Sequence, residues 1–131
     1  GGQFKGSSWK RAGFLRKILE EGPGPLEASD VSRDMKTATS GTGHYLVYLG
    51  KEINDTWTFN LPLKNASFGR PAEGNKYKVE IIDTWDMTIT PVPGIFETGA
   101  PNDYRVYDKT MKKIRIPLKP YLTLRITALN N

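Results

Sequence analysis

The chain has 131 residues, of which 37% are hydrophobic and 25% are charged, as in an ordinary globular domain. It is too short for an (α/β)8 barrel, which needs about 200 residues or more. It has no apolar run near the roughly 20 residues that cross a bilayer, so we expect no membrane partner. Because it contains no cysteine, it can hold neither a disulfide framework nor a thiolate metal site.

The net charge of +5 would suit an anionic partner such as an acidic polysaccharide or a nucleic acid. The basic residues are dispersed, however, so we interpret most of them as solvated surface. An anion-binding strip near residues 109–115 is an alternative. The absence of an RNP, KH or zinc-finger pattern predicts that nucleic acid is not a partner. The first residues, GGQFKGSS, lack an apolar segment and are not expected to be a signal peptide.

A helix is predicted near the start of the chain, with Ser7 or Ser8 as its cap and Gly22-Pro23 as its end. A helix of about 13 residues is not stable alone in water, so we expect it to pack on the β-domain or on another copy of the chain. The prolines after it mark a boundary between a helical segment, 1–22, and a β-domain, 23–131. The apolar residues at helical spacing are Ala12, Leu15, Ile18 and Leu19, with Phe14 beside them.

The next part of the chain mixes polar residues with two strand patterns. Residues 26–43 are rich in Ser, Thr, Asp and Gly, and we expect them to form an irregular, mobile connection. His44–Leu49 is β-branched and aromatic, and Thr56–Leu61 alternates apolar and polar residues, so both are predicted strands. We expect a hairpin through residues 50–55, and turns at the later FGRP and EGN clusters.

Residues 76–92, KYKVEIIDTWDMTITPV, show the clearest strand pattern, because apolar and polar residues alternate on both sides of Asp83–Asp86. One extended piece of this length would span roughly 55 Å at about 3.3 Å per residue. We therefore predict a central hairpin that turns at 83–86.

The rest of the chain completes a mainly β fold. A PVPG turn and a GAPND loop are followed by three short strands. About eight strands with turns every 8 to 12 residues, after one helix, predict an antiparallel β-sandwich. The three last strands are expected at residues 104–107, 113–116 and 121–127.

Few carboxylates are close enough in sequence to suggest catalysis. A glycosidase needs two carboxyl groups about 5 to 9.5 Å apart, one with a raised pKa, and Asp83 and Asp86 form the only tempting pair. Aspartate is a favoured turn residue because its side chain accepts hydrogen bonds from nearby backbone amides. We therefore predict that both are turn residues and that the chain has no catalytic residue.

Metal and cofactor sites are also not expected. His44 is the sole histidine, so it has no histidine partner for a metal site and is predicted to be structural or exposed. Asp30, Asp34 and Asp55 could bind Ca²⁺ through oxygen, but no DxDxDG-like spacing groups them. The glycines have no strand-then-helix context for a phosphate loop. No metal and no cofactor are predicted.

Aromatic side chains give the remaining functional signal. Sugar rings present apolar faces that pack on exposed Trp or Tyr, and four residues are candidates for such a contact. The alternative is that these rings fill the core of the sandwich or pack against a neighbouring domain. The candidate carbohydrate contacts are Trp57, Trp85, Tyr104 and Tyr107.

Four segments carry a resemblance to a known family: GFLRKILEEGPG, HYLVYLG, DTWDMTITPVPGIF and KPYLTLRI. With them the chain resembles the C-terminal DUF5605-type β-domain of bacterial multidomain glycoside hydrolases. In these proteins a DUF5060 domain often precedes an (α/β)8 barrel of the DUF4038 type. The resemblance implies a non-catalytic accessory β-sandwich that packs against the catalytic barrel, and slightly favours a secreted or periplasmic location. The candidate barrel interface is Trp9, Phe14, Leu15, Ile18 and Leu19.

Three other functions are left open by the sequence. The main alternative is an autonomous carbohydrate-binding module that uses exposed aromatics and keeps its parent enzyme on a polysaccharide. A protein ligand is a third option, because a related barrel family carries a C-terminal domain labelled as collagen-binding, and a small independent enzyme is a fourth. An exposed row of coplanar aromatics would favour the binding module. A contiguous apolar patch beside the helix would favour packing against a barrel.

Overall fold

The computed structural model describes residues 6–21, 27–31, 36–39, 43–51, 53–62, 73–102 and 105–129. These residues form one helix and eleven strands, where about eight strands were predicted, and every strand pair is antiparallel. The elements are α1 (Gly6–Glu20), β1 (Glu27–Val31), β2 (Lys36–Thr39), β3 (His44–Tyr48), β4 (Thr56–Thr58), β5 (Asn60–Pro62), β6 (Lys76–Asp83), β7 (Thr88–Pro91), β8 (Phe96–Asn102), β9 (Arg105–Asp108), β10 (Lys113–Arg115) and β11 (Leu122–Ala128).

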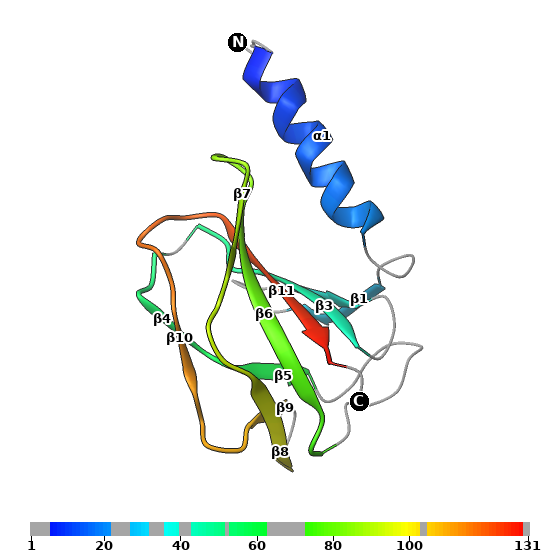
Figure 1. The fold of residues 1–131 in the computed structure, drawn as a ribbon, viewed down its shortest axis with the longest axis vertical. Helices are drawn as coiled ribbons and strands as arrows, with labels where there is room; N and C mark the ends of the chain where they lie inside the picture. The colour runs from blue at the N-terminus through cyan, green and yellow to red at the C-terminus, as the bar shows by residue number, and fades with distance from the viewer. Residues whose placement is uncertain are drawn as a thin grey trace.

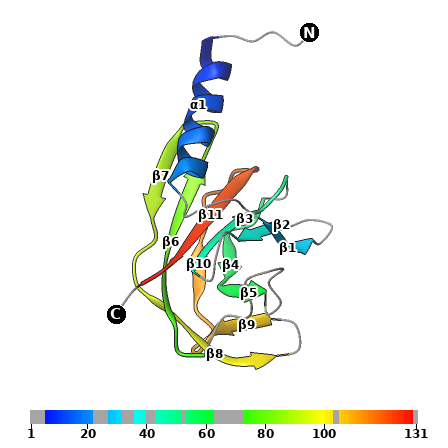
Figure 2. The ribbon, with the colours of Figure 1, turned by 90° about the vertical axis from the view of Figure 1, so that its right-hand side faces the viewer.

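The strands form two packed layers. Nine of the described strands belong to one long sheet in the order β1-β2-β3-β11-β6-β8-β9-β5, with β7 also paired to β6, while β4 and β10 form a second, small sheet. The long sheet curls, so that β8, β9 and β5 lie across from β3, β11 and β6 (Figure 1 and Figure 2). The mainly β, antiparallel and sandwich-like architecture predicted from the sequence is therefore confirmed.

The core lies between the layers because the long strands turn alternate apolar residues inward. On β6 the inward residues are Tyr77, Val79 and Ile81. Phe59 stacks on Phe96 with 4.9 Å between ring centroids, and its centroid lies 6.0 Å from that of Tyr77. Burial of one large apolar side chain contributes about 1.5–3 kcal/mol. The other members of this buried cluster are Tyr45, Val47, Leu61, Val106, Ile114, Ile116, Leu122, Leu124 and Ile126.

The predicted central hairpin is confirmed. Strands β6 and β7 pair from Asp83↔Thr88 to Glu80↔Pro91, with a turn at 84–87. On its other edge β6 pairs with β11 along seven residues, so it lies at the centre of the long sheet. The other strands predicted at 44–49, 104–107, 113–116 and 121–127 appear as β3, β9, β10 and β11, with bounds that differ by one residue.

Helix α1 begins earlier than predicted. It starts at Gly6, so Ser7 and Ser8 lie inside its first turn and the prediction that one of them caps it is wrong. The predicted end is closer, because the helix finishes at Glu20. Serine is a favoured cap residue at either position, but residue type alone locates the end of a helix only to within one or two residues.

The helix contacts the face of the sheet that points away from the core, as predicted (Figure 2). Ile81 points into the core, so its neighbour Ile82 points outward, yet Ile82 is only 1% exposed. Ile18 of the helix is 2% exposed and also lies outside the core cluster. The guanidinium of Arg125 on β11 forms an ion pair of 2.7 Å with Glu21, directly after the helix. The helix therefore covers the outer face of the sheet near Ile82.

The prediction that residues 26–43 are irregular is wrong where they are described. Residues 27–31 and 36–39 form the antiparallel strands β1 and β2, and β2 extends the sheet by pairing with β3 from Lys36↔Tyr48 to Thr39↔Tyr45. Such edge strands are held by backbone hydrogen bonds to a neighbour. That pairing needs no apolar alternation, so the polar sequence gave no strand signal.

The predicted hairpin between His44–Leu49 and Thr56–Leu61 does not form. The second segment divides into β4, which pairs with β10, and β5, which pairs with β9. Phe59 lies at the break, where its amide donates to the carbonyl oxygen of Lys112 at 3.1 Å. The division lets Phe59 enter the core while its neighbours join two sheets.

The predicted GAPND loop is also wrong for residues 99–102, which continue β8. The strand has a register irregularity between Thr98 and Pro101, and in this part its described partner is β9 alone. Proline is tolerated at bulges and at edges because its missing N–H is not needed there. The PVPG turn, in contrast, is confirmed by the positive φ of 93° at Gly94 between β7 and β8.

Candidate functional site

A cleft of 860 Å³ lies on the outside of the layer that contains β8, β9 and β5, at the end of the molecule formed by β8 and β9. Strand β9 provides one wall, because Val106 and Asp108 are buried while Arg105 and Tyr107 alternate with them on the outer side. Trp57 of β4 also lines this cleft. The structure thus brings together two predicted carbohydrate contacts, Trp57 and Tyr107, that lie 50 positions apart in the sequence.

The side chains of this cleft are held in place by neighbouring groups. Trp57 packs partly against the core and meets Phe59 edge to face, with 6.2 Å between ring centroids. Asn60 is 8% exposed; its amide nitrogen donates to the carbonyl oxygen of Thr58 at 2.8 Å, and its oxygen accepts a hydrogen bond from Nη1 of Arg105. Both the indole and the guanidinium are therefore preorganised.

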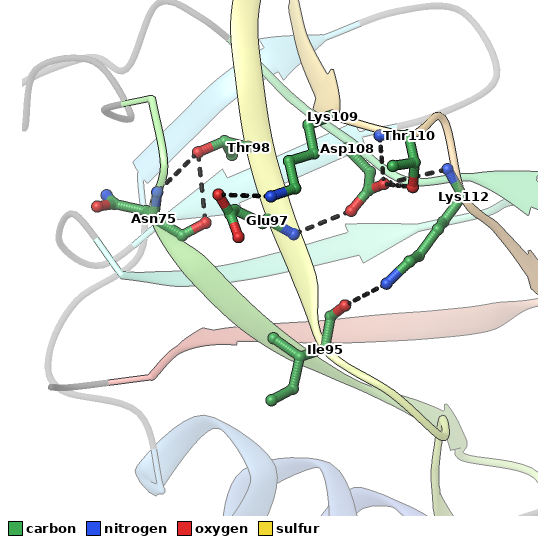
Figure 3. Close-up of polar contacts among 8 residues, drawn as sticks. All are labelled: Asn75, Ile95, Glu97, Thr98, Asp108, Lys109, Thr110 and Lys112. Carbon is green, nitrogen blue, oxygen red and sulfur yellow. Dashed lines mark hydrogen bonds and ion pairs between the residues drawn. The ribbon is translucent and has the colours of Figure 1, made fainter.

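Beside the cleft, the carboxylate of Asp108 organises the turn after β9 (Figure 3). It is 2% exposed and accepts hydrogen bonds from the amides of Glu97, Thr110 and Lys112 and from the Thr110 hydroxyl. Burial alone would raise the pKa of Asp108, but these hydrogen bonds outweigh it and lower that pKa. Its oxygens serve the turn, so Asp108 is a structural part of the cleft wall.

Two further contacts in Figure 3 fix the strand next to this turn. The ammonium of Lys109 forms an ion pair of 3.2 Å with Glu97, and Nζ of Lys112 donates to the carbonyl oxygen of Ile95 at 2.8 Å. Gly99 approaches the same segment closely, since a Cβ there would lie 3.0 Å from Cα of Lys109. The cleft wall made by β8 and β9 is thus closely packed.

A second surface lies at the opposite end of the molecule, where α1 meets the tip of the β6–β7 hairpin (Figure 1 and Figure 2). The guanidinium of Arg11 lies over the Trp85 ring, 3.7 Å from its centroid, and Nε donates to the carbonyl oxygen of Trp85 at 2.9 Å. Trp85 is nevertheless 69% exposed. It is therefore separate from Trp57 and Tyr107.

The hairpin tip is joined to the loop at residues 117–121 by a lysine. Oδ1 of Asp83 accepts hydrogen bonds from the amides of Trp85 and Asp86, while Nζ of Lys119 donates to Oδ2 of Asp83 at 2.8 Å and to Asp86. Burial acts to raise the pKa of Asp83, but the Lys119 hydrogen bond and the two amides lower it further than burial raises it. The same two carboxylates raise the pKa of Lys119 above its usual value.

Exposed apolar side chains gather on this end of the molecule. Arg11 and Leu15 lie one helical turn apart, on one face of α1, so Leu15 lies next to the contact between Arg11 and Trp85. Two residues here, Met87 and Tyr121, have positive φ angles of 56° and 62°, which non-glycine residues seldom adopt. We call this region the helix–hairpin surface; it comprises the exposed residues Leu15 and Leu19 of the helix and Trp85 and Met87 of the hairpin tip.

Charged groups beneath the end of the helix hold it to the sheet. Nε of Arg125 donates to Glu80 at 2.8 Å on the neighbouring strand, and its Nη1 pairs with Glu21. Burial acts to lower the pKa of Arg125, and the two carboxylates outweigh it and raise it. His44 is 7% exposed at the start of β3, and burial, followed by repulsion from Arg125, lowers its pKa. The histidine is therefore neutral and structural.

The other predicted site residues fall in several places. On the helix Ile18 is buried, Phe14 is partly buried, and Leu15 and Leu19 are 45% and 44% exposed. For Trp9 the structure describes the helical backbone and not the side chain, and Tyr104 lies outside the described residues. The sequence reasoning missed Arg105 and Asn60 in the cleft. The alternation of β9 was the available signal, because it places Arg105 on the same side as Tyr107.

The part of the chain that the structure describes has no cluster of metal-binding side chains and no membrane-spanning helix. None of its His, Asp and Glu side chains gather in a group of three or more that could hold a metal ion. Its one helix is too short and too polar to cross a bilayer.

Comparison with known proteins adds three findings. Residues 33–127 match the family described as Domain of unknown function (DUF5605). The chain is also similar to the crystal structure of a "putative glycoside hydrolase" from Bacteroides vulgatus, with a TM-score of 0.90 and 52% sequence identity. The similarity covers 98% of this chain and 25% of the other, so this chain spans a quarter of the length of that protein. No curated protein matches the sequence.

Proposed function

The chain belongs to the DUF5605 family, and from this premise we propose that it is a non-catalytic accessory β-domain of a glycoside hydrolase. In this proposal it packs against the catalytic (α/β)8 barrel of the same polypeptide and supports it. One observation carries the proposal: nearly the whole chain, 98% of it, corresponds to only a quarter of the Bacteroides protein. A fold that recurs as one part of a longer hydrolase chain has the rest of that chain as its natural partner.

The helix–hairpin surface is the part of the domain that suits such a partner. Exposed apolar patches on a folded domain mark interaction sites, and contacts between domains of one chain typically bury about 600–1,500 Å². Leu15 and Leu19 are each close to half exposed, on the helix that precedes the β-domain. In this proposal residues 1–22 connect the barrel to a β-domain of residues 23–131.

The described carboxylates support a non-catalytic role. A glycosidase acid has a raised pKa, whereas the pKa of Asp83 is lowered through Lys119 and two backbone amides. Asp86 is bound by the same lysine, and Asp108 is occupied by the turn after β9. The lowered pKa values of Asp83 and Asp108 keep both carboxylates ionised as acceptors within the fold, which suits a structural role.

The proposal is tested by comparing the same substitutions in two proteins. Serine would replace the residues aligned with Leu15 and Leu19 in the full-length Bacteroides protein, and Leu15 and Leu19 themselves in this chain. Thermal unfolding should shift to a lower midpoint in the long protein and stay nearly unchanged in this chain, because only the long protein has a partner for the leucines. The matched control is Ile95→Ser, since Ile95 is 49% exposed at the other end of the molecule.

An equal and small effect of the leucine substitutions in both proteins would contradict the proposal. So would an effect of the Ile95 control that matches that of the leucines in the long protein.

A further inference from the structure

We propose that the cleft lined by Trp57, Tyr107 and Arg105 is a binding site for a neutral glycan. It lies at the end of the molecule formed by β8 and β9, opposite the helix–hairpin surface (Figure 1 and Figure 2). A domain that packs on a barrel through one end would therefore leave this cleft accessible. Its volume of 860 Å³ falls within the range of about 300–1,000 Å³ seen for ligand sites.

The aromatic part of the cleft suits the apolar face of a sugar ring. Trp57 is partly buried, with its ring held against the core and Phe59, so its exposed edge has a fixed position. Tyr107 projects from β9 on the outer side, on the same side as Arg105. A ring that is already immobilised loses little conformational entropy when a ligand packs on it.

The polar part of the cleft can both donate and accept hydrogen bonds, as sugar hydroxyls require. Arg105 carries guanidinium donors, and its orientation is set by the buried side chain of Asn60. Glu73, on the turn before β6, provides a carboxylate acceptor at the same cleft. A hydroxyl group acts as donor and acceptor at once, so it can be paired by both residues.

The charges of the lining favour a neutral ligand over an anionic one. The cationic residues Arg105 and Lys109 are matched by the acidic residues Glu73 and Asp108. Lys109 is further neutralised by its ion pair with Glu97. An anionic ligand would gain from Arg105 but would meet Glu73, and like charges that lie close together repel.

The choice of a glycan among neutral polyhydroxyl ligands rests on the proposed function, whereas the location of the site does not. Failure of the two ideas can be distinguished. Loss of glycan binding would leave the effect of the Leu15 and Leu19 substitutions untouched, and absence of that effect would leave glycan binding in this chain untouched.

The test is affinity electrophoresis of the 131-residue chain through gels that contain neutral β-glucan, xylan, mannan or galactan, or acidic polygalacturonate or alginate. At least one neutral polysaccharide should retard the chain. Tyr107→Ala and Arg105→Met should reduce the association constant at least tenfold, because each removes one side chain from the outer face of β9. Trp85→Ala is the matched control, since it removes an exposed aromatic at the other end and should bind normally.

Trp57→Ala is informative only if the protein remains folded, because Trp57 also packs on the core. Circular dichroism of every variant checks folding, and the Tyr107 and Arg105 variants keep the test decisive if Trp57→Ala unfolds. The proposal is overturned if no polysaccharide retards the chain, if only the acidic ones do, or if Trp85→Ala abolishes the retardation while Tyr107→Ala does not.

Discussion

The guanidinium of Arg11 lies 3.7 Å from the centroid of the Trp85 ring, and its Nε donates a hydrogen bond of 2.9 Å to the carbonyl oxygen of the same residue. These residues are 74 positions apart in the sequence, and their contact attaches the helix to the tip of the central hairpin. The other attachment, between Glu21 and Arg125, lies just beyond the opposite end of the helix. Together with the buried Ile18, these contacts hold the described part of the helix on the sheet.

A double-mutant cycle with Arg11→Ala and Trp85→Ala should give a coupling of about 0.5–1 kcal/mol, the range for an exposed cation–π contact. Trp85→Ala keeps the backbone carbonyl that accepts the Arg11 hydrogen bond, so the cycle isolates the ring contact. Urea unfolding followed by circular dichroism measures it. Coupling that is indistinguishable from zero would show that the ring and the guanidinium do not interact in solution.

The helix should contribute to stability through Ile18 and hardly at all through Leu15 in this chain. Ile18 is 2% exposed and Leu15 is 45% exposed. We expect Ile18→Ala to lower the free energy of unfolding by about 2–5 kcal/mol, as for other buried large-to-small changes. Leu15→Ala should change it by about 0.5 kcal/mol or less. Similar losses for both variants in urea unfolding would mean that the helix lies on the sheet by another face.

The network of Asp83 and Lys119 should make stability depend on pH in the acid range. The pKa of Asp83 is lowered in the folded state, so its contribution is complete above the ordinary aspartate pKa of about 3.9 and is lost as pH falls through the folded value. Asp83→Asn keeps the oxygen that caps the turn but removes the charge.

We therefore expect Asp83→Asn to be less stable than the parent chain at pH 7, with a difference that shrinks as the pH falls below about 4. Thermal unfolding from pH 7 to pH 2 measures this difference. Asp86→Asn is the control, because its side chain is half exposed and its charge should matter less. A difference that stays constant with pH would exclude the charge of Asp83 as the cause.

Two glycines should respond oppositely to alanine. Gly13 lies inside α1 with open space where a Cβ would be, so Gly13→Ala should stabilise the chain by roughly 0.5–1 kcal/mol through helix propensity. A Cβ on Gly43 would lie 2.8 Å from Cβ of Ala128, so Gly43→Ala should cost about 1–3 kcal/mol, as overpacking does. Equilibrium unfolding of both variants checks the signs, and stabilisation by Gly43→Ala would show that β3 and β11 have room to separate.

The sequence predicted those parts of the fold whose signal is local. The hairpin of β6 and β7 was predicted because its strands alternate and Asp83 favours a turn, and its core residues followed from the same alternation. Strands β1 and β2 were missed because backbone pairing, of β1 with β2 and of β2 with β3, holds them and leaves no mark in residue type. The split at Phe59 was missed because it depends on two partners, β9 and β10, that come about 50 residues later in the chain.

The candidate site shows the same limit. Trp57 and Tyr107 were both candidates from their residue types. Their proximity depends on the pairing of β4 with β10 and of β5 with β9, which no local pattern encodes. Trp85 was an equal candidate from its residue type, but the structure places it at the other end of the molecule, against Arg11. The partnership of Asn60 with Arg105 likewise exists only once β5 pairs with β9.

The central claim, that the helix–hairpin surface packs on a catalytic barrel, is tested most directly in the crystal structure of the Bacteroides protein. The measurement is the exposed fraction of the side chains aligned with Leu15, Leu19 and Trp85, calculated with and without the remaining three quarters of that chain. The claim predicts that the remainder buries these side chains while those aligned with Ile95 and Tyr107 keep their exposure. If the first three stay as exposed with the remainder as without it, the domain does not pack on the rest of that chain through this surface.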